Sequence, residues 1–146
     1  MTAEHRVGLV GCVKSKRTSP APARDLYVSA LFRGQRAFVE KSCDEWFVLS
    51  AEHGLVDPDS VLAPYEKTLK DASTRERRDW SNRVLASIDS RFPDLHPIVF
   101  EMHAGVAYLG FGLVEGILAR GGQVENPVEG LSLGRRLSFY KKAGCL

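Results

Sequence analysis

The stretch RVGLVG at residues 6–11 decides the fold prediction, because it is a short apolar run that ends in glycine, as a buried β-strand does. Three later segments resemble it in length and pattern. They are EWFVLS at residues 45–50, PIVFEM at residues 97–102, and a shorter segment at residues 123–128. We therefore expect four β-strands, spread along the whole chain.

Segments with a helical spacing of apolar residues separate these strands. Ser73 followed by Glu76 forms a capping-box pattern at the start of one of them, and Gly121 ends another. The prolines and aspartates of residues 51–71 predict a long loop instead. The four expected helices span residues 23–41, residues 73 to about 88, residues 105–120 and residues 131–142.

Alternation of strands and helices predicts an α/β fold, in which an open, mostly parallel sheet carries helices on both faces as three layers. A chain of 146 residues is enough for a single domain spanning residues 1–146. The composition, 44% hydrophobic and 26% charged, is that of a globular protein and excludes a disordered chain or a coiled coil. No apolar run approaches the roughly 20 residues of a membrane span, and the start lacks a signal-peptide pattern, so we expect a cytoplasmic protein with no membrane partner.

Charge and cysteine content narrow the classes of partner. Twenty basic and eighteen acidic residues give a net charge of +2, which favours a small-molecule ligand over a polyanion and leaves a nucleic-acid partner as the less favoured alternative. Basic residues do cluster at 14–17, 75–78, 135–136 and 141–142, where solvated faces explain most of them. Three cysteines without a CxxC pair argue against a disulfide framework and a structural zinc site. The sequence leaves the oligomeric state open.

Polar residues follow each expected strand at its carboxyl end, where open α/β sheets bind their ligands. If the sheet is parallel, these groups meet at one edge. They are Cys12, Lys14, Ser15 and Lys16 after the first strand, Ser50, Glu52 and His53 after the second, Glu101, His103 and Gly105 at the third, and Glu125, Asn126 and Glu129 at the fourth.

Glu101, His103 and His53 are the candidate catalytic residues. A carboxylate at the end of an apolar strand has a raised pKa or needs a partner, and either condition suits acid–base or nucleophilic chemistry. A histidine beside it can orient the carboxylate or protonate a leaving group. The structural alternatives are a solvent-facing or helix-capping Glu101 and histidines that only make loop hydrogen bonds. A catalytic zinc bound by Cys12, the two histidines and a carboxylate is a weaker alternative, and we expect no metal or cofactor.

Residues 11–16, GCVKSK, resemble a phosphate-binding loop but lack the Walker A spacing. Lys14, Ser15 and Lys16 are candidate ligands for an anion, against the alternative of a solvated basic turn. Cys12 is either a nucleophile activated by these lysines or a small residue packed at a strand end. The remaining candidate substrate-binding residues are Ser50, Gly105 and three tyrosines able to stack on a base or bind a sugar hydroxyl, Tyr27, Tyr65 and Tyr108.

Several of these segments together resemble a family of small bacterial and phage proteins called peroxide-stress YaaA-like. The resemblance covers residues 11 to about 140 and includes GCVKSK, ARDLYVSALF, WFVLSAEHGLV, PYEKTL, HAGVAY and PVEGLSLG. More loosely, Cys12 and Lys16 match the C-x-x-x-K spacing of archaeosine synthase, which acts on a modified base in tRNA. Gly11 replaces the proline before that cysteine, and Phe32 stands near the place of the downstream histidine.

This resemblance implies a crevice shaped for a nucleobase or nucleotide, in a fold similar to uracil-DNA glycosylases and nucleoside deoxyribosyltransferases. The leading hypothesis is an enzyme acting on the N-glycosidic bond of a nucleotide, nucleoside or modified base, with Glu101 beneath the anomeric carbon. The alternatives are a non-catalytic nucleotide- or nucleic-acid-binding protein in stress response or phage defence, and a transferase that uses the Cys12 thiol.

Overall fold

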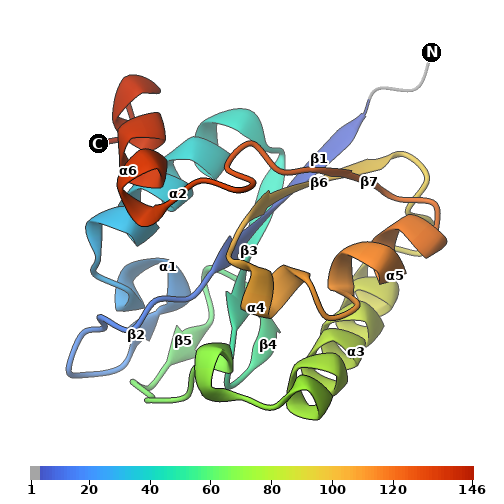
Figure 1. Ribbon diagram of the computed structural model, residues 1–146, viewed down its shortest axis with the longest axis horizontal. Helices are drawn as coiled ribbons and strands as arrows, with labels where there is room; N and C mark the ends of the chain where they lie inside the picture. Colours follow the sequence, from blue (N-terminus) through green and yellow to red (C-terminus); the bar gives the residue numbers. More distant parts are fainter. Residues whose placement is uncertain (1–3) are drawn as a thin grey trace.

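A five-stranded sheet with the strand order β4-β3-β1-β6-β7 forms the centre of the molecule (Figure 1). The computed structural model describes residues 4–146. The strands are β1 (His5–Gly11), β3 (Glu45–Ser50), β4 (Gly54–Val56), β6 (Ile98–His103) and β7 (Gln123–Glu125). All neighbouring pairs are parallel except β3 and β4. The prediction of an α/β fold with a mostly parallel sheet is confirmed.

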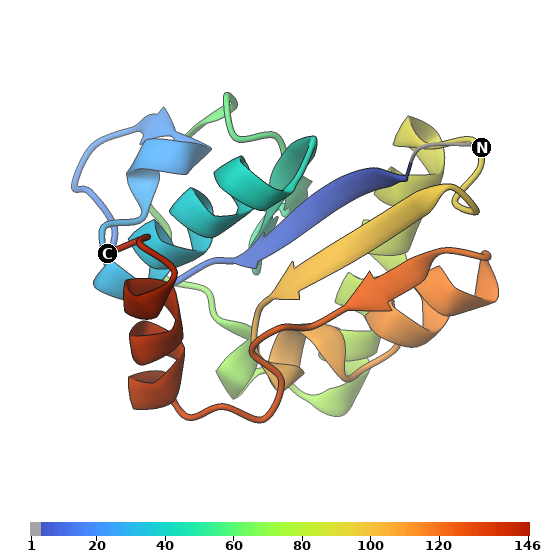
Figure 2. The same cartoon turned by 90° about the horizontal axis from the view of Figure 1, so that it is seen from above.

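Helices cover both faces of this sheet (Figure 2). On one face lies α2 (Ala30–Ser42), with α6 (Leu133–Lys142) packed against it. On the other face lie α3 (Thr74–Arg91), α4 (Val106–Leu109) and α5 (Leu113–Ala119). Side chains of β1 alternate between the two cores, since Val7 and Leu9 pack with α3 and α5 while Val10 packs with α2. This alternation makes RVGLVG apolar on both faces.

The helix expected over residues 23–41 is two helices, which corrects that prediction. The chain forms α1 (Ala23–Leu26), leaves the helix at Tyr27 and starts α2 at Ala30. Ser29 is the reason for the new start, because its side chain accepts a hydrogen bond from the backbone N–H of Phe32 and caps α2. The extended Tyr27 pairs instead with Lys16 in an isolated β-bridge.

The segment expected as one helix over residues 105–120 is also divided. Between α4 and α5 the backbone turns at Gly112, whose φ of 115° suits glycine. The strand expected over 123–128 ends at Glu125, and Pro127 cannot donate to a neighbouring strand. The capping prediction at Ser73 is confirmed, since its side chain accepts from the N–H of Glu76.

Residues 51–71, expected as a loop, contain short regular elements as well. They include β4, the strand β5 (Val61–Leu62), which pairs with β2 (Ala21–Pro22), and the 3-10 turn η1 (Leu69–Asp71). Strands this short carry too little periodicity to be recognised in a sequence. Within residues 4–146 we find no helix with the length and apolar character that crossing a bilayer requires.

Candidate functional site

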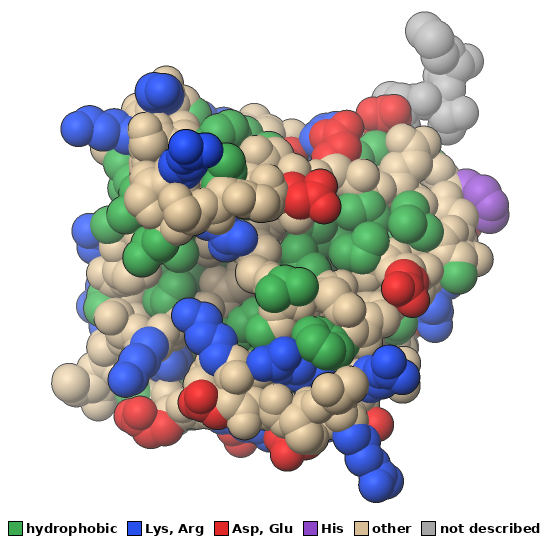
Figure 3. Space-filling view, viewed as in Figure 1, with side chains coloured by type: hydrophobic (Ala, Val, Ile, Leu, Met, Phe, Trp, Pro, Cys, Tyr) green, Lys and Arg blue, Asp and Glu red, His purple; other side chains and the backbone are tan. Residues whose placement is uncertain are grey.

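The carboxyl ends of β1 and β6 form the place in this sheet where the order of the strands reverses. From β1 the chain crosses to β3 on one side through α2, whereas β6 and β7 lie on the other side. Open α/β sheets bind ligands outside such a switch point. Cys12 directly follows β1 and Tyr108 follows β6, and the Cys12 Sγ lies 3.2 Å from the Tyr108 Oη. Figure 3 shows the surface hollowed between α6 and α4, with Lys and Arg side chains around the hollow.

A second group of side chains, from the end of β3, the residue after α1 and the loop after β5, is joined by hydrogen bonds. The hydroxyl groups of Tyr27 and Tyr65 lie 2.5 Å apart, and Ser50 Oγ donates to Tyr65 Oη at 2.8 Å. Ser50 also accepts from the backbone N–H of His53 at 3.0 Å. The exposed His53 ring stands perpendicular to Tyr65, with 5.5 Å between the ring centroids. Tertiary structure therefore brings together four residues that the sequence proposed separately.

Lys16 extends over these tyrosines. Its Nζ lies 4.5 Å from the centre of the Tyr65 ring and 5.7 Å from that of Tyr27, both within the range of a cation–π contact. Burial lowers the pKa of Lys16 because the ammonium loses hydration, and nearby Cys12 and Glu66 oppose this effect. A lowered pKa raises the fraction of neutral, nucleophilic amine near neutral pH.

We call these residues the strand-end cluster: Cys12, Lys16, Tyr27, Ser50, His53, Tyr65 and Tyr108. Burial raises the pKa of Tyr27 to about 12 and raises the pKa values of Tyr65 and Tyr108 as well. The phenols therefore stay protonated at neutral pH and can donate hydrogen bonds. The cluster offers aromatic faces, hydroxyl donors, a thiol, an amine and an imidazole.

The predicted anion ligands differ in their placement. Lys14 and Ser15 are exposed, and the Lys14 carbonyl accepts a hydrogen bond from Lys16 Nζ at 3.2 Å. The loop that carries them does not lead into a helix N-terminus, because the next helix begins only at Ala23. Gly105 lies directly before α4, and a side chain added there would meet no atom within 4 Å, so open space adjoins it.

Glu101 and His103 lie outside the strand-end cluster, which corrects the expectation that all these groups meet at one edge. Glu101 pairs with Gly8 in the interior of the sheet. Because residues two apart on a strand point to the same face, its side chain and that of His103 both face α2 and α6. The Glu101 carboxylate accepts from His103 Nε2 at 2.8 Å, from Ser42 Oγ at 3.0 Å and from Arg6 Nη2 at 2.9 Å.

These partners determine the charge of Glu101. Burial by itself would raise its pKa, but the hydrogen bonds from His103, Arg6 and Ser42 outweigh burial and hold the pKa at about 2. On its other side, His103 is hydrogen-bonded through Nδ1 to the buried hydroxyl of Tyr140 at 2.6 Å. Glu101 is thus ionised and fully engaged, which fits a structural ion pair better than a general acid.

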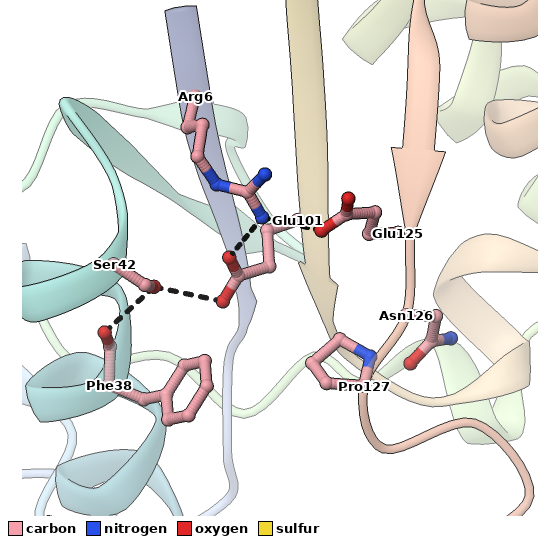
Figure 4. A pocket seen from close by; sticks show the side chains of 7 residues that line it. All are labelled: Arg6, Phe38, Ser42, Glu101, Glu125, Asn126 and Pro127. Atoms are coloured by element: carbon pink, nitrogen blue, oxygen red, sulfur yellow. Dashed lines mark hydrogen bonds and ion pairs between the residues drawn. The ribbon is translucent and has the colours of Figure 1, made fainter. Parts of the chain in front are cut away.

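A cavity of about 520 Å³ opens beside Glu101 (Figure 4). We call it the Arg6 pocket. Its lining comes from β1, from α2, from β6 and from the end of β7 with the residues that follow, namely Arg6, Phe38, Ser42, Glu101, Glu125, Asn126 and Pro127. Arg6 Nη2 donates to Glu101 and also to Glu125, at 2.5 Å.

Sequence reasoning missed Arg6, Ser42 and Tyr140 as partners of the polar strand residues. Arg6 carried a weak signal, since a charged side chain within a buried strand needs a partner. Its partner Glu101 lies 95 positions away, so no local pattern joins them. Within residues 4–146, no three His, Cys, Asp or Glu side chains gather closely enough to hold a metal ion.

Comparison with known proteins gives a family but no activity. Residues 7–142 match the model of a family of unknown function, DUF6884, and the chain belongs to that family. No curated protein and no solved structure matches the chain. The matched region includes the strand-end cluster and the lining of the Arg6 pocket except Arg6 itself, which lies one position before the match.

Proposed function

We propose that this protein is an enzyme that acts on the N-glycosidic bond of a nucleotide, nucleoside or modified base, in the strand-end cluster. The observation that carries the proposal is the placement of the Lys16 amine over the rings of Tyr65 and Tyr27, beside Cys12 and at the switch point of the sheet. The resemblance of GCVKSK to the C-x-x-x-K segment of archaeosine synthase supports a base as the ligand.

In this proposal the aromatic residues hold the base. The ring of Tyr65, which is only partly buried, offers a stacking surface, and stacking of a base on an aromatic ring contributes roughly 1–3 kcal/mol. The hydroxyl of Tyr108 and the thiol of Cys12 lie 3.2 Å apart and can both reach a ligand between β1 and β6. Lys14 and Ser15, exposed at the rim, are placed to contact a phosphate if the ligand carries one.

Lys16 takes the role that the sequence hypothesis gave to Glu101. Its neutral amine attacks the anomeric carbon, so that a bond from carbon to Nζ forms while the bond from carbon to the base breaks. The base leaves with the bonding electrons and takes a proton from His53, and the new ammonium loses its extra proton to solvent. A water molecule or a second base then attacks the same carbon, the bond from carbon to Nζ breaks as the nitrogen takes up a proton from solvent and leaves as the neutral amine, and the incoming group loses a proton, giving hydrolysis or transfer.

Base release by single variants tests this proposal. The wild-type protein is incubated with a panel of nucleosides and nucleoside monophosphates, and free base is measured by chromatography. We expect Lys16→Met to lower the rate by at least about a hundredfold, because it removes the nucleophile. The matched control is Lys142→Met, an exposed lysine on α6, which should keep the wild-type rate.

The pattern across two variants separates the lysine mechanism from the thiol alternative. Cys12→Ser should retain most of the base release if Lys16 is the nucleophile. If Lys16→Met keeps full activity while Cys12→Ser loses it, the result supports the alternative of a transferase that uses the Cys12 thiol. No base release from any substrate in the panel would count against the enzyme proposal itself.

A non-catalytic nucleotide- or nucleic-acid-binding protein is the second candidate, and the Lys and Arg side chains around the hollow in Figure 3 favour it. Exposed basic residues stand at the start of α3 and on α6, among them Arg75, Arg78 and Arg135. A protein that contacts several phosphates loses affinity steeply as salt rises. A steep salt dependence of binding to single-stranded nucleic acid, without base release, would favour this candidate.

We also propose that the protein works in a reducing compartment such as the cytoplasm. Cys12, Cys43 and Cys145 are all free thiols, and unpaired cysteines are typical of proteins kept reduced by the cell. Burial raises the pKa of Cys43 to about 11, so this thiol resists oxidation.

A further inference from the structure

The Arg6 pocket has hydrogen-bonding atoms left over after its internal ion pairs are made. Arg6 uses Nη2 for both Glu101 and Glu125, which leaves Nε and Nη1 as donors. Glu125 uses one oxygen and is half-exposed. Asn126 uses Oδ1 to accept from the N–H of Val128, which leaves its amide nitrogen as a donor. The free donors of Arg6 and the free acceptor of Glu125 therefore lie close together at one side of the cavity, whereas Asn126 lies further along its wall with the amide nitrogen pointing away from them (Figure 4).

The walls of the pocket are suited to a flat ligand. The Phe38 ring and the Pro127 ring both line it, and such surfaces pack against the faces of an aromatic heterocycle. The volume of about 520 Å³ lies within the range typical of small-molecule sites. Flat, polar-edged molecules match this combination better than aliphatic ones.

The charges of the pocket exclude one ligand class and favour another. Glu101 and Glu125 together carry two negative charges against the single positive charge of Arg6. An anionic ligand group would therefore meet a net negative field. A neutral ligand that accepts from Arg6 and donates to Glu125 gains two charge-assisted hydrogen bonds without this repulsion.

We infer that the Arg6 pocket binds a nucleobase through an edge that carries a carbonyl next to ring and amino N–H groups, as guanine does. The carbonyl accepts from Arg6 Nη1 or Nε, and the N–H groups donate to the free oxygen of Glu125. Guanine has two such donors beside its carbonyl, whereas adenine offers only its amino group, flanked by ring nitrogen acceptors.

This site is separate from the strand-end cluster and goes beyond the proposed function. Glu101 is opposite Gly8 on β1, and Cys12 is four residues further along the chain, about 13 Å away at the rise of a β-strand. A ligand in the Arg6 pocket therefore lies beside the sheet, on the face covered by α2, and does not need the reaction proposed for Lys16.

Titration with guanosine, adenosine and 1-methylguanosine tests the inference, with binding followed by calorimetry. We expect guanosine to bind at least about tenfold more tightly than either of the others. Methylation removes the ring N–H that donates a hydrogen bond to Glu125, and adenosine has no carbonyl to accept from Arg6. Glu125→Gln should weaken guanosine binding by about tenfold or more, since the amide carries no charge. Glu129→Gln, an exposed carboxylate four residues away, is the matched control and should leave binding unchanged.

The same measurements distinguish this inference from the proposed function. If guanosine binding survives Glu125→Gln but is lost in Lys16→Met, the base binds in the strand-end cluster and the Arg6 pocket inference is wrong. If guanosine, adenosine and 1-methylguanosine bind equally well, or if none of them binds, the Arg6 pocket does not recognise the guanine edge and the inference is also wrong. Thermal unfolding of Glu125→Gln confirms that the variant is folded.

Discussion

Glu101 illustrates how one residue can have the right chemistry in a different place from the one expected. A carboxylate between Phe100 and Met102 needs a partner, and it has four in Arg6, His103, Ser42 and Cys43. The need for a partner could be predicted from the sequence, because an unpaired buried charge is costly. The identity of the partners could not, since Ser42 and Arg6 come from segments far along the chain.

Acid should destabilise the protein through Glu101. The pKa of this carboxyl is about 2 in the folded protein and close to 4.5 when unfolded. The folded state therefore binds fewer protons, so the stabilisation is complete above about pH 4.5 and is lost as the pH falls towards 2. We expect a contribution of about 3 kcal/mol to the free energy of unfolding.

Denaturant unfolding at a series of pH values measures this effect. Glu101→Gln should lower the free energy of unfolding at pH 7 by about 3 kcal/mol, because it leaves His103 without a carboxylate partner and Arg6 with Glu125 alone. The variant should also show a flatter dependence on pH between 4.5 and 2. If the free energy of unfolding of the variant falls as steeply between pH 4.5 and 2 as that of the wild type, other carboxylates dominate the acid sensitivity.

At the scale of elements, close packing of α2 on β1 orders one face of the sheet. A β-carbon added at Gly8 would lie 2.7 Å from a methyl group of Val39 on α2. Gly8 is also opposite Glu101 on β6, so this contact helps to seat α2 over the Arg6 pocket. The breaks after α1 and α4 show the same dependence on context, because the chain leaves α1 at Tyr27, which pairs with Lys16, and turns at Gly112 before α5 begins.

A pair of glycine-to-alanine variants tests this packing. Gly8→Ala should lower the free energy of unfolding by about 1–3 kcal/mol, because Val39 or the helix must move. A β-carbon added at Gly134 in α6 would have no atom within 4 Å. Gly134→Ala should therefore raise the free energy of unfolding by about 0.5–1 kcal/mol, because alanine has the higher helix propensity. Both changes in stability are obtained from the midpoints of denaturant unfolding. A Gly8→Ala protein as stable as the wild type would contradict the close contact between Gly8 and Val39.

At the scale of the whole molecule, β1 is the central strand of the five-stranded sheet. It pairs on both edges, with β3 and β6, and helices cover both of its faces. The opposite case is the two-stranded ribbon of β2 and β5, where Val61 is exposed and only two residue pairs align. The molecule therefore combines a rigid central strand with a lightly held ribbon near the strand-end cluster.

Hydrogen exchange followed by mass spectrometry should show this contrast. We expect amides of residues 7–11 and 99–103 to exchange most slowly, at the rate of global unfolding, because they open only when the sheet does. Residues 58–64 should exchange faster, through local opening. Protection of the ribbon equal to that of β1 would contradict this picture and indicate a single cooperative unit.

The sequence by itself determined the class of fold and the approximate limits of the main strands. Apolar runs such as residues 6–11 and 45–50 are local signals, and alternation with helical segments leaves few topologies. Only the tertiary structure decided which polar residues share a site. Cys12, Lys16, Tyr65 and Tyr108 meet because the strand order and the loop after β5 bring them together, while the direction of side chains on β6 turns Glu101 to another face. The physical reason is that periodicity depends on neighbours in the chain, whereas a site depends on contacts between residues far apart in it.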